Sequence, residues 1–355
     1  HESNKAARIR SRFLPAIDLL PVLGLVAVLG LGGHRVISGD MSLGGLVAFN
    51  AYLTMLIWPM RNIGMTVAMG QRAASALVRI HEILAVVPAI ADPPHPLRLP
   101  QAAVAQPVGA VKFENVRFGY EIGHTDIRVL EGFNFSVAPG ESVAIVGATG
   151  SGKSTIARLL LRFYDPQAGS VSLDGIDLRQ LRLPDLRHSV GVVFEDTLLF
   201  HDTVSANIAF AKPEIDFEVV QRAAKLAGAH DFIMQLPNKY DTSLGERGYS
   251  LSGGQRQRIA IARAIVADPR VLVLDDATSA VDPTKEHEIR DALATVMRGR
   301  TTLVIAHRPA TIELADRVVL LDEGRISATG SHHELLETNE KYRSVLAAMT
   351  STVIE

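Results

Sequence analysis

The sequence predicts two parts: an α-helical hairpin that crosses a membrane, and a following α/β domain that includes a helical subdomain. Three observations support this fold class. Two long apolar runs lie within the first seventy residues, where charged residues are scarce. From Val111 onward, short apolar runs typical of strands alternate with helical stretches. A glycine-rich loop also separates one apolar strand from the helix that follows it.

The composition narrows the class of protein. A chain of 355 residues is long enough for about two domains. Lysine and arginine number 36 against 38 acidic residues, and this balance argues against a protein that coats nucleic acid. The absence of cysteine excludes disulfides and thiolate metal sites. The chain opens on His1 without the pattern of a signal peptide, so we expect it to be the C-terminal portion of a longer protein.

The expected hairpin begins with an apolar run from Phe13 to Gly33, interrupted only by Asp18. About twenty residues cross a bilayer as a helix, so this run is just long enough. A turn is expected at His34–Asp40, and the second run extends from Leu43 to Met60. Basic residues lie beyond both outer ends, which the positive-inside rule assigns to the cytoplasm. The alternative is a buried hairpin of a large soluble protein, which paired runs of this length with basic flanks disfavour.

Three residues within the runs are unusual for a membrane span. Asp18 lies close to the basic cytoplasmic end, and pairing with Arg12 or contact with water explains it better than a function in transport. Asn50 is compatible both with a hydrogen bond between helices and with lining a pathway. Pro59 is predicted to kink the second helix.

A linker is expected after the membrane part. Residues 71–87 have the pattern of a helix that leaves the membrane, and the chain from Pro88 to Pro107 is rich in proline and alanine. We therefore expect a membrane part at residues 1–87, a linker at 88–109 and the α/β domain at 110–355.

The α/β domain is predicted from its apolar runs. Val271–Leu274 is fully apolar, as expected for a central parallel strand that is buried on both faces. A helical patch between about Val204 and Ala267 interrupts the strand pattern. The other expected strands are Val111–Phe118, Ser142–Val146, Ser170–Leu173, Val190–Phe194, Thr301–Ala306 and Arg317–Leu321.

The glycine-rich loop has the sequence GATGSGKST and lies between an expected strand and an expected helix, Ile156–Leu161. In this context the G-x-x-x-x-G-K-S spacing predicts a backbone that surrounds phosphate groups with its amide hydrogens. A glycine-rich turn without a ligand is the alternative, and the full spacing disfavours it. The predicted nucleoside triphosphate site consists of Gly147, Ala148, Thr149, Gly150, Ser151, Gly152, Lys153, Ser154 and Thr155.

Three residues have individual roles in this prediction. Lys153 is expected to reach the outer phosphates, and the hydroxyl of Ser154 is expected to bind Mg²⁺. Asp275 closes an apolar strand and is expected to hold the same ion through water.

The run LSGGQRQRIAIARAI, Leu251 to Ile265, resembles the signature of ATP-binding cassette (ABC) proteins. With the phosphate loop, it identifies the soluble part as similar to an ABC cassette, a P-loop NTPase with a helical subdomain. The expected contacts to a γ-phosphate come from the start of a helix, where amide groups are free. The resemblance implies that this helix serves a second cassette, so that two cassettes hold two ATP molecules between them. The residues concerned are Ser252, Gly253, Gly254 and Gln255.

Other motifs extend the resemblance. Tyr120, in FENVRFGY, looks like the aromatic residue on which adenine stacks. Asp282, in SAVD, looks like the loop between the two ATP sites, and His307, in VIAHR, looks like the histidine that contacts the γ-phosphate. The hairpin resembles the last two transmembrane helices of an exporter half-transporter, whose first four helices this chain lacks.

Two residues depart from the family pattern. Asp276 replaces the usual glutamate that polarises the attacking water, and a misplacement of about 1 Å can lower the rate on the order of 100-fold. Glu195, in VVFEDTLLF, replaces the usual glutamine near the magnesium ion and cannot donate an amide hydrogen. Both affect one site, while the signature is intact. The chain therefore resembles the degenerate-site subunit of a heterodimeric multidrug or lipid exporter.

The resemblance implies a multi-pass protein of the plasma membrane with its cassette in the cytoplasm. Its cofactors would be ATP and Mg²⁺, and its cargo a small amphipathic molecule or a lipid. The expected partner is a second half-transporter, with a heterodimer favoured and a homodimer possible, and no nucleic acid is expected. A non-transporting ABC ATPase, such as a DNA-repair or translation factor, would lack the hairpin. A vestigial or regulatory fragment stays open, because two of six helices cannot enclose a pathway.

Overall fold

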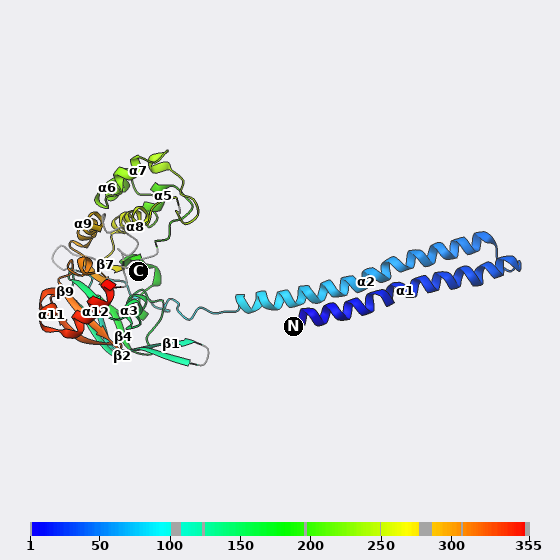
Figure 1. The fold of residues 1–355 in the computed structure, drawn as a ribbon, viewed down its shortest axis with the longest axis horizontal. Coiled ribbons are helices and arrows are strands. Elements are labelled where there is room, and N and C mark those ends of the chain that lie inside the picture. Colours follow the sequence, from blue (N-terminus) through cyan, green and yellow to red (C-terminus); the bar gives the residue numbers. More distant parts are fainter. Residues whose placement is uncertain are drawn as a thin grey trace. The chain divides into compact units, whose positions relative to one another are not determined.

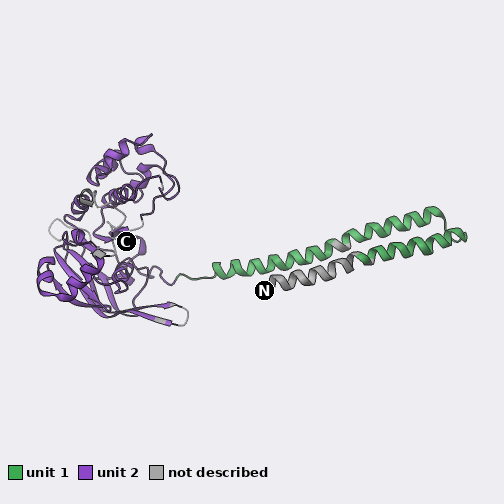
Figure 2. Cartoon of the chain, viewed as in Figure 1, with its two compact units in different colours: residues 1–88 green, residues 89–355 purple. Residues whose placement is uncertain are grey.

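The structure is a computed structural model that describes residues 2–100, 108–122, 125–194, 197–248, 250–276, 286–306 and 308–351. The chain divides into two compact units, residues 1–88 and 89–355, which are coloured separately in Figure 2.

Unit 1 consists of two long helices that lie side by side (Figure 1), α1 at Glu2–Ile37 and α2 at Leu43–Leu84. The Ser42 hydroxyl caps α2 by accepting a hydrogen bond from the backbone N–H of Gly45 at 3.1 Å. The predicted turn at His34–Asp40 is wrong in its bounds, because helix α1 continues to Ile37. Helix α2 runs on through Pro59, so the second apolar run and the expected exit helix form one element.

The apolar side chains of α2 are largely exposed within the chain. By length and composition α2 can cross a membrane, whereas the apolar stretch of α1 in the described residues, Pro21–Ile37, is shorter. The membrane hairpin therefore remains a prediction. Large side chains of α2 that are more than half exposed include Val47, Phe49, Met55, Leu56 and Trp58.

Unit 2 contains two sheets. The larger has the order β10-β9-β3-β8-β7-β6, in which only β10 is antiparallel to its neighbour. The smaller is antiparallel, with the order β2-β1-β4-β5. The strands are β1 Val111–Ile122, β2 Thr125–Val137, β3 Ser142–Val146, β4 Ala168–Leu173, β5 Ile176–Asp177, β6 Val190–Phe194, β7 Val271–Asp275, β8 Thr301–Ile305, β9 Arg317–Asp322 and β10 Arg325–Gly330.

The central strands are buried on both faces, because successive side chains of a strand point to opposite sides of the sheet. In β7, Val271 and Val273 enter one apolar cluster, while Leu272 and Leu274 enter the other. The first cluster fills the space between the two sheets and includes helix α3, Lys153–Leu160. The second joins the large sheet to the helices on its other face. The sheet is thus a rigid base for the loops at the carboxyl ends of its strands.

A helical lobe interrupts the sheet between β6 and β7, as predicted (Figure 1). It contains α5 Val204–Ile208, α6 Phe217–Leu226, α7 His230–Met234, α8 Gly253–Ala267 and the short helices Lys239–Asp241 and Glu246–Gly248. The remaining described helices are α4 Leu183–Ser189, α9 Glu286–Met297, α10 Pro309–Ile312, α11 His332–Thr338, α12 Glu340–Ser351 and a short turn at Leu178–Gln180.

Candidate nucleotide site

The phosphate loop connects the buried strand β3 to α3. Two of its glycines have positive φ angles, 83° at Gly150 and 107° at Gly152, which residues with a side chain rarely adopt. At Gly147 a Cβ atom would overlap the carbonyl oxygen of Leu321 in the neighbouring strand β9. These positions explain why glycine is needed at three points of the loop.

Lys153 is the buried cation of the loop, with 5% of its surface exposed. Its Nζ donates hydrogen bonds to the carbonyl oxygens of Gly147 at 2.7 Å and Ala148 at 3.0 Å. Burial lowers the pKa of Lys153, and the negative charges of Asp275 and Asp276 oppose this shift. Both carboxylates therefore act on the same ammonium group, across the loop from the strand end.

Two serines of the loop differ in exposure. Ser151 is buried, and within the described part of the chain its Oγ has no hydrogen-bond partner. A buried hydroxyl without a partner is unfavourable unless a ligand satisfies it. Ser154, one residue past Lys153, is exposed, so its hydroxyl is accessible from the outer side of the loop.

The carboxyl ends of three parallel strands meet beside this loop. By register, Phe194 of β6 and Ile305 of β8 are both opposite Asp275 of β7. Asp276 leaves the strand with a φ of 48°, and its backbone N–H donates to the carbonyl oxygen of Ile305 at 2.8 Å. Three further predicted site residues lie outside the described residues: Glu195, Asp282 and His307.

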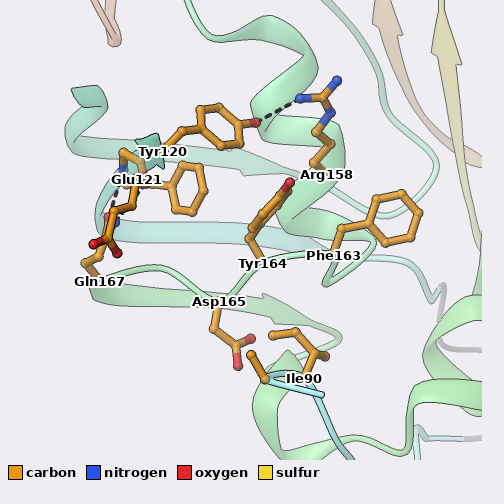
Figure 3. A pocket seen from close by; sticks show the side chains of 11 residues that line it. Ile90, Tyr120, Glu121, Arg158, Phe163, Tyr164, Asp165 and Gln167 are labelled. Atoms are coloured by element: carbon orange, nitrogen blue, oxygen red, sulfur yellow. Dashed lines mark hydrogen bonds between the residues drawn. The ribbon is translucent and has the colours of Figure 1, made fainter. Parts of the chain in front are cut away.

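Tyr120 lies at the far end of β1 and borders a pocket of about 830 Å³ (Figure 3). Its Oη accepts a hydrogen bond from Nη1 of Arg158 at 3.1 Å and lies 3.2 Å from Oγ1 of Thr155. The rings of Phe118 and Tyr164 stand almost perpendicular to the Tyr120 ring, with centroids at 5.0 and 5.3 Å. Tyr120 thus contacts α3, the helix that begins at the phosphate loop.

Arg158 and Tyr164 are missing from the site predicted by the sequence. The spacing of Thr155 and Arg158 is a usable signal, because residues three apart share one face of a helix. That signal does not reveal Tyr120 as the residue they meet, since it lies 38 positions before Arg158.

The signature segment begins helix α8. Ser252 is its N-cap and forms a capping box with Gln255, through hydrogen bonds of 3.3 and 2.9 Å. Gly253 and Gly254 are the first residues of the helix. In Figure 1, α8 lies among the helices of the lobe, whereas α3 lies among the strands.

The structure thus brings together one part of the predicted site. The charges of Asp275 and Asp276 act on Lys153, and the Tyr120 hydroxyl lies 3.2 Å from Oγ1 of Thr155, two residues beyond that lysine. The signature residues belong to the other lobe.

Comparisons with known proteins identify relatives. A family model described as ABC transporter matches residues 130–279. The chain is 40% identical over 341 residues to an uncharacterized ABC transporter ATP-binding protein, YknU, of Bacillus subtilis (strain 168), covering 96% of this chain and 57% of that protein. It is 44% identical over 310 residues to an ATP-dependent lipid A-core flippase of Saccharophagus degradans, covering 87% and 51% of the two chains.

A solved structure, that of a bacterial Atm1-family ABC exporter with ATP bound, is also similar. The TM-score is 0.77 at 37% identity, over 98% of this chain and 60% of that one. This chain therefore spans between about half and three-fifths of the length of the relatives it matches.

Proposed function

Because this chain contains an ABC transporter ATP-binding domain with an N-terminal helical region, we propose that it is the ATP-hydrolysing part of an ABC exporter subunit. The observation that carries this proposal is the phosphate loop. There the charges of two aspartates act on a buried lysine, and a buried serine hydroxyl lacks a partner within the described residues.

The described residues fit ATP and Mg²⁺. The glycine backbone and Lys153 would hold the phosphates, and the orphaned Oγ of Ser151 would gain a partner. Mg²⁺ prefers oxygen ligands and is commonly held by one or two carboxylates together with phosphate oxygens. Ser154 and Asp275 supply protein oxygens of this kind, and Mg²⁺ would neutralise charge that develops on the phosphates.

The remaining cassette residues have proposed roles in the reaction. Tyr120 is the platform for adenine, and His307 contacts the γ-phosphate. Ser252, Gly253, Gly254 and Gln255 complete the ATP site of a partner cassette, and Asp282 connects the two sites.

Residues 1–87 are proposed to be the last two membrane helices of the exporter, with 88–109 as a linker and 110–355 as the cassette. The support is the exposed apolar surface of α2, a helix that is long and apolar enough to cross a membrane, because large exposed apolar surfaces mark membrane or protein contacts. In this arrangement the protein is multi-pass in the plasma membrane and the cassette is cytoplasmic. Relatives of comparable identity are named for lipid A-core flipping, multidrug efflux and alpha-hemolysin translocation, and the proposal of a lipid or small amphipathic cargo rests on the first two of these names.

The chain's own ATP site is proposed to be slow. Asp276 is one methylene shorter than glutamate, and its backbone is fixed by the hydrogen bond to Ile305. A shorter side chain on a fixed backbone leaves the carboxylate farther from an attacking water. Glu195 would add a negative charge near Mg²⁺. The intact signature would then serve a faster site in a different partner subunit, so we favour a heterodimer.

Hydrolysis by Asp276 variants tests this proposal. We expect Asp276→Glu to raise turnover at this site, by on the order of 10- to 100-fold if geometry limits the rate. The measurement is phosphate release by the purified membrane assembly, with Lys153→Met as the control for background turnover. If Asp276→Asn abolishes all turnover in an assembly that contains only this chain, Asp276 is a competent base and the weakened site is wrong.

A further inference from the structure

The hydroxyl group of Tyr120 connects strand β1 to helix α3. An aromatic ring that only stacks on a base needs no hydroxyl, yet here both neighbours of that group lie on α3. Arg158 donates to the Tyr120 oxygen at 3.1 Å, which leaves the tyrosine proton available for Oγ1 of Thr155 at 3.2 Å. The hydrogen bond with Tyr120 also raises the pKa of Arg158, so the donor stays charged.

The two α3 residues differ in what they can do for a ligand. Thr155 is buried, with 5% exposed, and lies in the first turn of α3, directly after the glycines of the phosphate loop. Arg158 is one turn farther along the helix and exposed. Residues three apart share a helix face, so both reach the same tyrosine oxygen. The Tyr120 hydroxyl is therefore held by two residues of the helix that begins at the phosphate loop.

The ring is restrained on its other sides as well. The rings of Phe118 and Tyr164 stand at 87° to it and restrain the plane of the ring. Tyr164 is seen beside Tyr120 in Figure 3. Tyr164 follows α3 in the chain, so its backbone is tied to the same helix. A ring held this way loses little further freedom when a planar base stacks on it.

We propose that Arg158 is a positioning residue, which with Thr155 locks the Tyr120 ring to the phosphate loop so that base and triphosphate are bound as one rigid unit. This inference rests on the proposed function, because it takes Tyr120 as the platform for adenine. In this proposal Arg158 acts through the Tyr120 hydroxyl. Its guanidinium carbon also lies 5.9 Å from the centre of the Tyr120 ring and the residue lines the pocket, so direct contact with the nucleotide is the alternative that the double variant tests.

The test measures nucleotide binding by the full chain in mild detergent with Mg²⁺. The variants are Tyr120→Phe, which keeps the ring and removes the hydroxyl, Arg158→Met, and the double variant. Arg222→Met, at an exposed arginine of α6, is the matched control. Each protein is titrated with ATP and, in competition, with inorganic tripolyphosphate, which has phosphates but no base. Thermal unfolding verifies that each variant is folded.

We expect Arg158→Met to bind ATP about three- to tenfold more weakly, as the loss of one charge-assisted hydrogen bond predicts, and Tyr120→Phe, which also loses the contact with Thr155, to bind at least as weakly. The double variant should bind no more weakly than Tyr120→Phe, because the hydrogen bond that Arg158→Met removes is already absent without the Tyr120 hydroxyl. Binding of tripolyphosphate should be the same in all variants, and Arg222→Met should match the unchanged chain.

Three results would overturn the proposal. Additive losses in the double variant would mean that Arg158 contacts the nucleotide directly. Equal losses for ATP and tripolyphosphate would mean that the variants distort the phosphate loop. Unchanged ATP binding in both single variants would show that the ring needs no anchor. If the unchanged chain binds neither ligand, the proposed function fails as well, and this result is distinct from the other three.

Discussion

At the scale of single residues, the phosphate loop buries Lys153, and burial disfavours its positive charge. Burial of Lys153 lowers its pKa, which means that the charged form is disfavoured in the folded protein. Two carbonyl oxygens and two nearby aspartates offset part of this penalty. A buried cation with such neighbours is typical of a binding site, where a ligand's negative charge completes the compensation.

His332 is a second buried ionisable residue, outside the nucleotide site. Its Nδ1 lies 2.7 Å from Oη of Tyr342, and its Nε2 lies 3.9 Å from Oε1 of Glu313. Burial lowers the pKa of His332, and the nearby Glu313 opposes the shift. Because the folded pKa is below the unfolded value of 6.5, the unfolded chain takes up a proton first as the pH falls.

We therefore expect the cassette to lose stability as the pH falls from neutral through 6.5. The melting temperature of the variant His332→Gln should fall less between pH 7.5 and pH 5 than that of the unchanged chain. For a domain of this size, a change of 1 kcal/mol in the free energy of unfolding shifts the melting temperature by about 2–4 °C. The measurement is thermal unfolding at the two pH values, with His201→Gln, at an exposed histidine that does not contribute to the pKa shift of His332, as the control. An equal acid-induced loss in both variants would contradict this origin of the pH dependence.

At the scale of elements, α8 and α11 begin with the same device. Ser252 with Gln255, and Ser331 with Glu334, each form a capping box at the start of their helix. Only α8 carries the proposed signature, so the two caps allow a role in stability to be separated from a role in ATP hydrolysis.

We expect Ser252→Ala and Ser331→Ala to lower the free energy of unfolding by similar amounts, about 0.5–2 kcal/mol. Only Ser252→Ala should also lower ATP turnover, by at least about tenfold, because a donor to the partner's phosphate is lost. Denaturant unfolding and phosphate release measure the two effects. Equal ATP turnover in both variants would contradict a role of Ser252 in ATP hydrolysis.

The strands show which elements a sequence can predict. Val190–Phe194 was predicted with its observed bounds, and the β7 and β9 runs with one residue missing from each, because continuous apolar runs mark strands buried on both faces. Strand β2, Thr125–Val137, was not predicted, since polar residues and a glycine break its pattern where it pairs irregularly with β1. Strand β10 was missed because it alternates half-buried and exposed residues at the sheet edge.

The site residues likewise divide into those that a local sequence pattern predicts and those that depend on packing. The phosphate loop and the signature are local patterns, so the sequence predicts them without knowledge of the fold. The contact of Tyr120 with Arg158 depends on how β1 and α3 pack, and no local spacing encodes it. The proximity of Asp275 and Lys153 is an intermediate case. It can be predicted from the sequence once a parallel sheet is assumed, because the loops at the carboxyl ends of its strands lie close together.

At the scale of the whole molecule, the chain contains one cassette and a helical region with an exposed apolar surface. The signature and the phosphate loop belong to different lobes of the cassette. Two chains placed head to tail would bring each signature to the other's phosphate loop, which explains why both motifs are on one chain. We therefore propose that this chain acts in a membrane, beside a second cassette, with ATP between the two cassettes.

The most direct test is native mass spectrometry of the complete, tagged protein after mild detergent extraction from its own membranes. The account predicts a complex with a second, different ABC subunit, and ATP retained at the slow site. Recovery of this chain in the soluble fraction, without a second cassette and without nucleotide after incubation with Mg²⁺ and ATP, would contradict it.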